Sequence, residues 1–586
     1  MRLSLDYSDQ LHVKIVAEFS EEFYWNGVCR FFPDCVHHGE TIIEVSVYEF
    51  ITQLEHLHAF CLSNTIRLEF APRLLEHIKD FYKNQKEEIR SWGENQLRAR
   101  LEAAGFHRKL RWFQMRNVCK LIQRNQGASF SVPGAGKTTE ALAFFYAIAN
   151  AEDVLLVVAP KNAFCAWDEQ LAECTGDSDL QFTRITGSAN VALLRTMGLR
   201  FYLMNYHTLA NCNDEVVTFL RRHPNAFVFL DESHRVKNPA GTWARSVRQI
   251  ATLPRARLVL SGTPMPQGPK DLLTQYNFLY PNVRVDESNV VERFKTIYVR
   301  TTADDLGITK IETRIVELEL DAIEREIYKK MRSLSLQEAS RLPTQDGRYL
   351  RNLGKCVMRL MAYVSNPALL ADELARIHPQ MREYLMCKDS KKVAYVCKRA
   401  RQLAAENKKV IIWSTFVENV ELIAYRLKDI GADYIHGQVD AGSDDDLTTR
   451  EGKLKRFHKD PHAMVLVANP AAASEGISLH TVCQYAIYMD RSYNAAHFLQ
   501  SQDRIHRLGL PEGTVPIVEI VQCKDTIDQS IDQRLKDKVR RMADALNDPS
   551  IVARDDSVYS DETEGDYGAG LTEGDRESIL NHLKMV

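Results

Sequence analysis

The 586-residue chain has little that would place it in a membrane or a secretory pathway. No apolar run approaches the roughly 20 residues that cross a bilayer, and no signal segment opens the sequence, so we expect no membrane partner. Its 12 cysteines include no Cys-x-x-Cys pair, which fits free buried thiols in a reducing compartment. We therefore predict a cytoplasmic protein, or a nuclear one if its source is eukaryotic.

Metal ligands and excess positive charge are also scarce. One cluster has metal-binding residue types, namely Cys29, Cys35, His37 and His38, but its spacing matches no zinc pattern, so we expect ordinary packing. The net charge of −3 gives no global attraction to nucleic acid. Any such contact must come from local basic patches. Arg108, Lys109 and Arg111 are candidates for one, with a solvated face as the equal alternative.

A glycine-containing loop carries the strongest chemical signal. It reads SVPGAGKT at 131–138, and Gly134 and Gly136 allow a tight turn whose N–H groups point at phosphate oxygens. Lys137 is placed to reach the β and γ phosphates, and the Thr138 hydroxyl to ligate Mg²⁺. A helix-forming segment follows, which puts a helix N-terminus at the phosphates. ATP and Mg²⁺ are therefore the expected cofactors. The predicted cofactor-binding residues here are Pro133, Gly134, Ala135, Gly136, Lys137, Thr138 and Thr139.

Two carboxylates supply the expected partners of this loop. The apolar run AFVFL at 226–230 predicts a strand buried on both faces of a parallel sheet, and Asp231 and Glu232 follow at its carboxyl end. Ligands of open α/β sheets bind at that edge. We expect Asp231 to hold Mg²⁺ and Glu232 to polarise the attacking water. A pair of carboxylates in a solvated loop is the weaker interpretation.

Apolar runs that alternate with helical segments predict two α/β lobes, each with a doubly wound parallel sheet. The first set lies at 154–160, 201–209, 226–230 and 257–264, and the second at 408–415, 432–437, 463–470, 485–490 and 514–521. Only the first lobe has a phosphate loop. The second contains QSQDRIHRLG, in which Arg504 and Arg507 would share one helix face and stabilise charge at the γ-phosphate. A solvated basic helix is the alternative.

These strings together resemble the SWI/SNF-type (Snf-family) ATP-dependent DNA translocases of helicase superfamily two. The resemblance covers roughly residues 108–540 and rests on LRWFQ, DESHRVKNP, LSGTPMPQGPKDLLTQYNFLYP and QSQDRIHRLG. Two departures are Ser131 at the start of the phosphate loop and Leu510 in place of the final glutamine of the last motif. With no chromatin-reading segment legible, the pattern predicts a compact bacterial or phage member, acting in the bacterial cell or the phage-infected host near the nucleoid.

The resemblance implies an overall organisation. The expected fold class is α/β, with two RecA-like doubly wound parallel-sheet lobes, helical insertions and an N-terminal α+β accessory domain. Its expected parts are an accessory domain at 1–105, lobe 1 at 106–282, a mainly helical linker at 283–390, lobe 2 at 391–545 and an acidic, disordered tail at 546–586. In the first part, 1–50 predicts strands and 66–105 a helical stretch. Ile527, Ile531 and Leu535 predict a buried helix stripe.

The resemblance also implies an activity, ATP-driven movement along double-stranded or branched DNA in repair, recombination, replication or defence. Gln114 is placed to read adenine, and Gly476 to bind nucleotide. Ser261, Thr263 and Gln500 are expected to couple DNA to the ATP site. Expected DNA-phosphate contacts are Lys161, Asn162, Asn205, Tyr206, His207, Thr208, Thr415, Ser474 and Glu475. Trp167 is expected in the core.

Two other functions stay open. One is a helicase that separates the strands of DNA or RNA, which would bring in single-stranded DNA or RNA as partner. The other is an ATP-gated scaffold switched by a protein partner, although the sequence identifies no such partner. Lys137, Glu232 and Arg507 argue against a scaffold, because a switch without turnover would be free to lose them. We expect a monomer.

Overall fold

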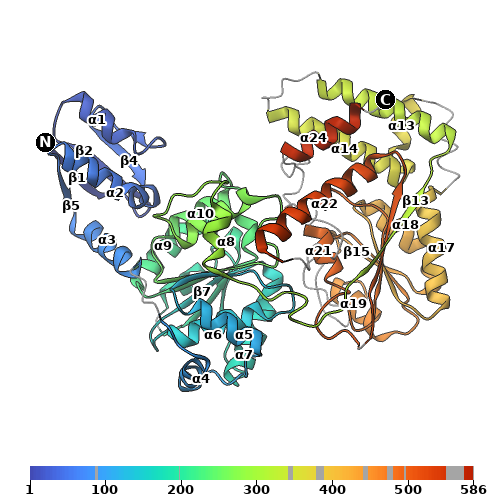
Figure 1. Ribbon diagram of the computed structural model, residues 1–586, viewed down its shortest axis with the longest axis horizontal. Helices are drawn as coiled ribbons and strands as arrows, with labels where there is room; N and C mark the ends of the chain where they lie inside the picture. Colours follow the sequence, from blue (N-terminus) through green and yellow to red (C-terminus); the bar gives the residue numbers. More distant parts are fainter. Residues whose placement is uncertain are drawn as a thin grey trace. The chain divides into compact units, whose positions relative to one another are not determined.

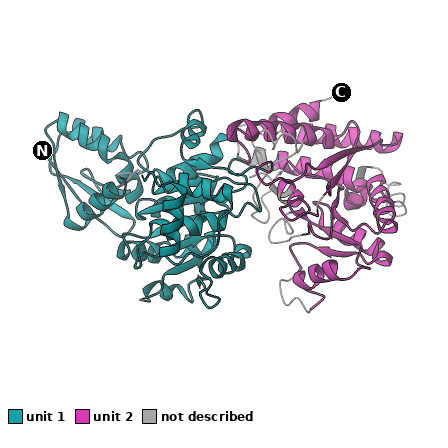
Figure 2. Cartoon of the chain, turned by 60° about the horizontal axis from the view of Figure 1, so that its bottom comes forward, with its two compact units in different colours: residues 1–265, 269–302 teal, residues 266–268, 303–586 magenta. Residues whose placement is uncertain are grey.

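The computed structural model describes residues 1–85, 90–196, 198–340, 347–377, 389–439, 446–470, 479–493, 496–511, 513–548 and 573–584. These form two compact units (Figure 2). Unit 1 comprises residues 1–265 and 269–302, and unit 2 comprises 266–268 and 303–586. Among the described residues, no helix has both the length and the apolar composition needed to cross a bilayer.

The first part of unit 1 is an α+β domain (Figure 1). Its five-stranded sheet has the order β3-β4-β2-β1-β5, with β1 and β5 parallel and the other pairs antiparallel. The elements are β1 (Arg2–Tyr7), β2 (His12–Ala17), α1 (Glu22–Cys29), β3 (Val36–His37), β4 (Ile42–Ser46), α2 (Val47–Ser63), β5 (Arg67–Phe70) and α3 (Pro72–Gln85). Alternate residues of the strands, such as Leu3, Leu5, Val13 and Ile15, are buried, as expected for a sheet covered on one face.

Two expectations for this domain differ from the structure. The segment 41–50 does not stay a strand, because the Ser46 side chain accepts a hydrogen bond from the Glu49 amide and caps α2. The expected helical stretch from residue 66 is interrupted by β5, which pairs with β1. Pairing with a distant strand therefore determines the conformation of a segment whose own composition favours a helix.

The rest of unit 1 is the first α/β lobe. Its seven strands are parallel, in the order β12-β6-β11-β10-β7-β9-β8. They are β6 (Gln126–Ser129), β7 (Leu155–Val158), β8 (Thr183–Ile185), β9 (Phe201–Met204), β10 (Phe227–Asp231), β11 (Ala256–Leu260) and β12 (Tyr298–Val299). Helices lie on both sides of the sheet, with α6 and α7 on one side and α8 and α10 on the other (Figure 1).

The helices of this lobe are α4 (Glu94–Ala103), α5 (Trp112–Leu121), α6 (Lys137–Ile148), α7 (Phe164–Thr175), α8 (Tyr206–Asn211), α9 (Asn213–Arg222), α10 (Thr242–Ile250), α11 (Leu272–Leu279) and α12 (Val290–Lys295). The predicted end of lobe 1 at residue 282 is too early. Strand β12 pairs with β6, so the sheet needs the chain as far as Thr301, whose carbonyl accepts from the Val132 amide.

Unit 2 holds the second α/β lobe, again with a parallel sheet, in the order β13-β18-β17-β14-β16-β15. Its strands are β13 (Glu312–Leu318), β14 (Val410–Trp413), β15 (Asp433–Ile435), β16 (Val465–Ala468), β17 (Tyr485–Tyr488) and β18 (Ile517–Cys523). The two parallel sheets confirm the predicted fold class. Strand β13 lies in the stretch expected to be mainly helical, where ETRIVELEL is the one segment that predicts a strand, and it forms one edge of this sheet.

The helices of unit 2 are α13 (Ala322–Ser340), α14 (Gly347–Ser365), α15 (Ala371–Ile377), α17 (Lys391–Ala405), α18 (Val417–Arg426), α19 (Arg450–Lys459), α21 (Ala496–Gln502), α22 (Ile527–Leu546) and α24 (Glu573–Lys584). In α22 the predicted stripe of Ile527, Ile531 and Leu535 is buried.

The expected disordered tail is wrong for residues 573–584, which form α24. This helix packs on α13, α14 and α22, and its Ile579 is fully buried. Buried Asp575 receives hydrogen bonds from Arg534 Nε and Lys538 Nζ of α22, each 2.7 Å long. An acidic composition over the preceding residues hides this short amphipathic segment. The acidic stretch 555–566 itself lies outside the described residues.

We expect Asp575→Asn to destabilise unit 2 by about 3 kcal/mol, because it leaves two buried cations without their carboxylate. The measurement is urea denaturation of the full chain followed by circular dichroism. Asp544→Asn, which changes an exposed carboxylate on the partner helix α22, is the matched control and should leave the unfolding midpoint in place. Equal midpoints for both variants would refute a docked α24.

Candidate nucleotide site

Three predicted motifs meet at one edge of the lobe 1 sheet. Strands β6, β11 and β10 are neighbours and parallel, so their carboxyl ends point the same way. The phosphate loop follows β6, and the Ser261–Thr263 segment follows β11. Asp231 is the last residue of β10, and Glu232 comes directly after it. A Cβ at Gly262 would lie 3.1 Å from Pro133 Cδ, so the first and third segments touch.

The phosphate loop has the backbone that its sequence predicts. Gly134 and Gly136 have φ of 84° and 85°, in the left-handed region that glycine adopts without strain. Lys137 is the first residue of α6, so the helix N-terminus faces the loop, an arrangement suited to phosphate. The Lys137 ammonium donates to the Ser131 carbonyl over 3.0 Å. These donors, with Thr138 beside them, fit a nucleotide triphosphate and Mg²⁺.

Gln114 is joined to the phosphate loop by its side chain. Its Nε2 donates to the Ala135 carbonyl over 3.1 Å, and its Oε1 accepts from the Arg111 amide over 3.0 Å. A Cβ at Gly136 would lie 2.3 Å from Gln114 Nε2, so the loop glycine is needed for this contact. The Gln114 side chain therefore supports the loop from α5. Its hydrogen bonding to adenine stays a prediction.

Asp231 and Glu232 occupy different environments although they are adjacent. Asp231 Oδ2 accepts from Trp167 Nε1, and its Oδ1 from the Glu232 amide, both over 2.9 Å. Burial, followed by the Glu232 charge, raises the pKa of Asp231. Burial alone would raise the pKa of Glu232 too, but His234 and then Lys137 outweigh it and lower that pKa. Glu232 thus stays ionised and suited to accept a proton from water.

The backbone at Glu232 is held in an unusual conformation. Its φ and ψ are 47° and 50°, the left-handed region, which costs free energy for a residue with a Cβ. The strain is compatible with the folded state because β10 on one side and a short 3₁₀ turn at Ser233–Val236 on the other fix the chain. It turns the Glu232 side chain away from the direction that a regular strand would give.

His234, which we did not single out from the sequence, joins two motifs. Its Nδ1 lies 3.3 Å from Glu232 Oε2 and 3.1 Å from Ser261 Oγ. Ser261 Oγ in turn accepts from the Thr263 amide over 3.1 Å. A continuous path therefore runs from the segment after β11 to the candidate base. The histidine of the DESH motif could have indicated this role, because an imidazole two residues from a candidate catalytic carboxylate can hydrogen-bond to it.

Two aromatic residues hold the end of β10 in place. Trp167 is fully buried, which confirms its predicted place in the core, and its indole N–H is the Asp231 donor already described. The Tyr206 hydroxyl donates to the Asp231 carbonyl over 2.7 Å. Sequence patterns gave no sign of these contacts, since both partners are distant along the chain.

The predicted DNA contacts of lobe 1 divide into two groups. Lys161 and Asn162 follow β7 and are exposed, as is His207 in α8. Asn205, Tyr206 and Thr208 are buried, so contact of their side chains with DNA is not compatible with this structure. Asn205 instead caps α8 by accepting from the Thr208 amide over 2.8 Å.

Only some of the predicted site residues of lobe 2 are among the described residues. Thr415 follows β14 and its amide donates to Asp490 Oδ1 over 2.6 Å. Helix α21 ends at Gln502, so Arg504 and Arg507 lie on turns and not on one helix face as expected. After the helix, the Ile505 amide donates to the Gln502 carbonyl, three residues back, and this turn buries Ile505. Ser474, Glu475, Gly476 and the side chain of Gln500 lie outside the described residues.

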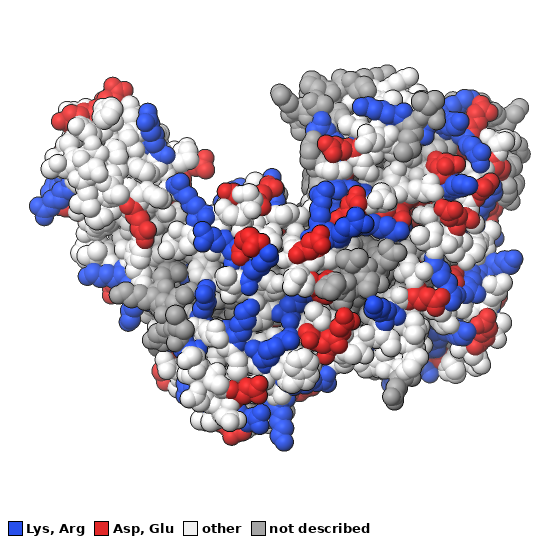
Figure 3. Space-filling model, in the orientation of Figure 1, with Lys and Arg blue, Asp and Glu red and all other residues white. Residues whose placement is uncertain are grey.

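Surface charge is mixed over the face seen in Figure 3, where Lys and Arg side chains alternate with Asp and Glu. In the predicted basic patch, Lys109 and Arg111 are exposed, whereas Arg108 pairs with Glu173. The described surface therefore offers Lys109 and Arg111 as a small exposed basic patch here.

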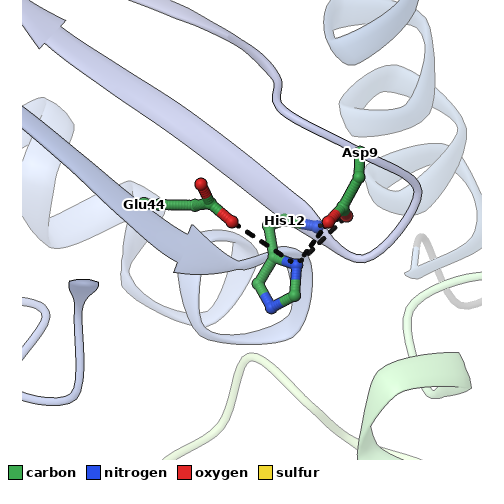
Figure 4. A group of neighbouring side chains, drawn as sticks. All are labelled: Asp9, His12 and Glu44. Atoms are coloured by element: carbon green, nitrogen blue, oxygen red, sulfur yellow. Dashed lines mark hydrogen bonds and ion pairs between the residues drawn. The ribbon is translucent and has the colours of Figure 1, made fainter. Parts of the chain in front are cut away.

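One group of three metal-donor side chains lies in the N-terminal domain, among the described residues: Asp9, His12 and Glu44 (Figure 4). Asp9 Oδ1 accepts from the amides of Leu11 and His12 over 2.6 and 2.8 Å, so Asp9 closes the turn between β1 and β2. His12 Nδ1 lies 2.9 Å from Asp9 Oδ2. The group thus has a structural role in the turn. In the cluster of cysteines and histidines noted in the sequence at 29–38, the Cys35 thiol lies 3.5 Å from His37 Nε2.

Among solved structures, the Sulfolobus solfataricus SWI2/SNF2 ATPase core in complex with dsDNA is 17% identical and aligns over 78% of this chain and 98% of that one, with a TM-score of 0.33. The fold assignment therefore rests on the two parallel sheets themselves.

Comparison with curated proteins finds similar animal proteins. Chromodomain-helicase-DNA-binding protein 7 of Homo sapiens is 24% identical over 445 residues, which are 68% of this chain and 14% of that protein. Chromodomain-helicase-DNA-binding protein 3 homolog of Caenorhabditis elegans is 22% identical over 430 residues, 64% of this chain and 23% of that protein. The chain thus spans less than a quarter of either relative. A bacterial or phage origin stays a prediction.

Two protein families match the chain itself. The SNF2-related domain matches residues 113–300, which include the phosphate loop, Asp231, Glu232 and Ser261. The helicase conserved C-terminal domain matches residues 391–509, which include Arg504 and Arg507. The chain therefore carries an SNF2-related domain followed by a helicase conserved C-terminal domain.

Proposed function

We propose that this protein is a DNA-dependent ATPase that translocates on double-stranded DNA and remodels DNA structures or protein–DNA complexes. The observation that carries the proposal is the single sheet edge at which the phosphate loop, Asp231, Glu232 and the Ser261 segment meet. Both domain matches support ATP use, and the names of the relatives support DNA as the partner.

In this proposal, lobe 1 binds and activates the nucleotide. Lys137 and the loop amides bind the phosphates, while Thr138 and Asp231 hold Mg²⁺, which neutralises phosphate charge when bound. Glu232, kept ionised by its neighbours, orients the attacking water and accepts its proton. Arg504 and Arg507 of lobe 2 supply positive charge for the transferred phosphoryl group, and Gly476 contributes to nucleotide binding.

In this proposal, the loops at the carboxyl edges of the two sheets contact DNA. Lys161, Asn162 and His207 are the exposed candidates in lobe 1, and Thr415, Ser474 and Glu475 are the candidates in lobe 2. Such contacts address phosphates and carry no base code, so affinity should fall steeply with salt. Ser261 and Thr263 couple this contact to Glu232 through His234, with Gln500 as a further coupling residue.

Blunt duplex DNA is expected to stimulate ATP hydrolysis more than single-stranded DNA, forked DNA or RNA. The measurement is steady-state phosphate release by the full chain at saturating MgATP. Glu232→Gln is expected to lower the rate by about 100-fold or more, since it removes the general base but keeps the side-chain shape. Stimulation confined to single strands or RNA would favour a strand-separating helicase. Hydrolysis indifferent to every nucleic acid would favour a protein-triggered scaffold.

The double variant Ser261→Ala, Thr263→Ala is expected to hydrolyse ATP at the basal rate without DNA but to lose most of its DNA stimulation. The reason is that Ser261 Oγ is the link to His234 and thus to Glu232. The measurement is the ratio of ATPase rates with and without duplex, beside DNA affinity by fluorescence anisotropy. Full stimulation in the double variant would show that this path carries no coupling.

A further inference from the structure

A buried polar cluster lies directly behind the phosphate loop. It consists of Asn117 from α5, Ser129 at the end of β6, Ser131 of the loop, Glu140 of α6 and Thr301 after β12. None of these residues is more than 2% exposed. We call it the loop-base cluster. It joins the neighbouring segments within residues 117–140 to Thr301, which is distant along the chain, at the point where the loop leaves the sheet.

Glu140 is the central acceptor of the loop-base cluster. Its Oε1 accepts from Asn117 Nδ2, and its Oε2 from Ser129 Oγ, both over 2.8 Å. The Asn117 amide also donates to Thr301 Oγ1 over 2.9 Å. Each carboxylate oxygen thus has a partner on a different segment, which is what a buried acid needs to be tolerated.

Ser131 connects the cluster to the phosphate-binding groups. Its hydroxyl accepts from the Thr301 amide over 3.0 Å and lies 3.3 Å from Ser129 Oγ. Its carbonyl accepts from the Lys137 ammonium. The start of the loop is therefore fixed from behind by side-chain hydrogen bonds, and the same residue meets the lysine in front.

We propose that Glu140 is a positioning residue whose carboxylate, bonded to Asn117 and Ser129, holds the start of the phosphate loop in the shape that binds ATP. The inference rests on the proposed function, because it assigns Glu140 to the same nucleotide site. Glu140 does not touch the nucleotide in this proposal, since it lies behind the loop and acts through Ser131 and Lys137.

Burial raises the pKa of Glu140, while its hydrogen bonds to Asn117 and Ser129 and the two cations that face it, Lys137 on its own helix and Arg116 on α5, act in the opposite direction.

A matched pair of variants tests the hydrogen bonding. Glu140→Gln keeps the shape and an acceptor, whereas Glu140→Leu keeps the volume and removes both acceptors. We expect Leu to raise the KM for ATP by about 10-fold or more, the loss typical of charge-assisted hydrogen bonds, with kcat changed far less. Gln should recover most of the affinity. An identical KM for the wild type and the Leu variant would overturn the proposal.

The split between KM and kcat separates positioning from simple loss of structure, because a partly unfolded preparation lowers kcat and leaves KM unchanged.

Two further measurements keep the result interpretable. Thermal melting identifies a Leu variant that has lost its fold, and in that case Asn117→Ala, which removes the donor to Oε1, replaces it and should raise KM in the same way. A wild type that hydrolyses no ATP would refute the proposed function. An active wild type whose KM ignores both Glu140→Leu and Asn117→Ala would refute this inference alone.

Discussion

The parallel register of β6, β11 and β10 is the constraint on which the candidate site depends. Parallel strands bring their carboxyl ends to one edge, so three loops that are far apart in sequence must meet there. The phosphate loop, the Asp231–Glu232 pair and the Ser261 segment each need only follow the correct strand. All three strands are buried, and the apolar runs of β10 and β11 fix this register, while the polar chemistry is added at the strand ends.

Buried polar groups at this edge set a second condition. A carboxylate removed from water must be hydrogen-bonded or neutralised, and the described structure solves this differently for each acid. Asp231 receives an indole N–H, Glu232 has His234, and Glu140 receives an amide and a hydroxyl. The partners of Asp231 and Glu140 come from other segments, and His234, which follows Glu232 by two residues, also contacts Ser261. The pairing that satisfies the acids therefore also ties the loops together.

Much of the fold was legible in the sequence because buried parallel strands leave continuous apolar runs. Strands β7, β9, β10 and β11 of lobe 1 and β14 to β18 of lobe 2 fall where those runs predict them, whereas the short strands β6, β8 and β12 were not predicted. The failures have physical causes. Ser46 ends a strand through a side-chain cap, β5 is decided by pairing with β1, and α24 is held by the buried Asp575 contacts. The contacts of β5 and α24 depend on distant partners and not on local composition, whereas the Ser46 cap is a local contact with Glu49.

The same distinction applies to the site. Lys137, Asp231 and Glu232 were identified from the sequence because short motifs fix their places next to strand ends. Trp167, Tyr206 and Glu140 support those residues from elsewhere, and no spacing rule connects them. The three buried residues Asn205, Tyr206 and Thr208 show the reverse error, since a position near the functional edge does not establish that a side chain reaches the surface.

Ser131 shows how a departure from a motif can be explained by its surroundings. From sequence it is only a small residue that the loop can accept in place of glycine. In the structure its hydroxyl accepts from the Thr301 amide and lies next to Ser129, so the side chain does what glycine cannot. A hydroxyl at this point is useful only if the groups behind it are polar as well, and Glu140, Asn117 and Ser129 are. The serine in the loop and the buried acid behind it are therefore best understood as parts of one adaptation.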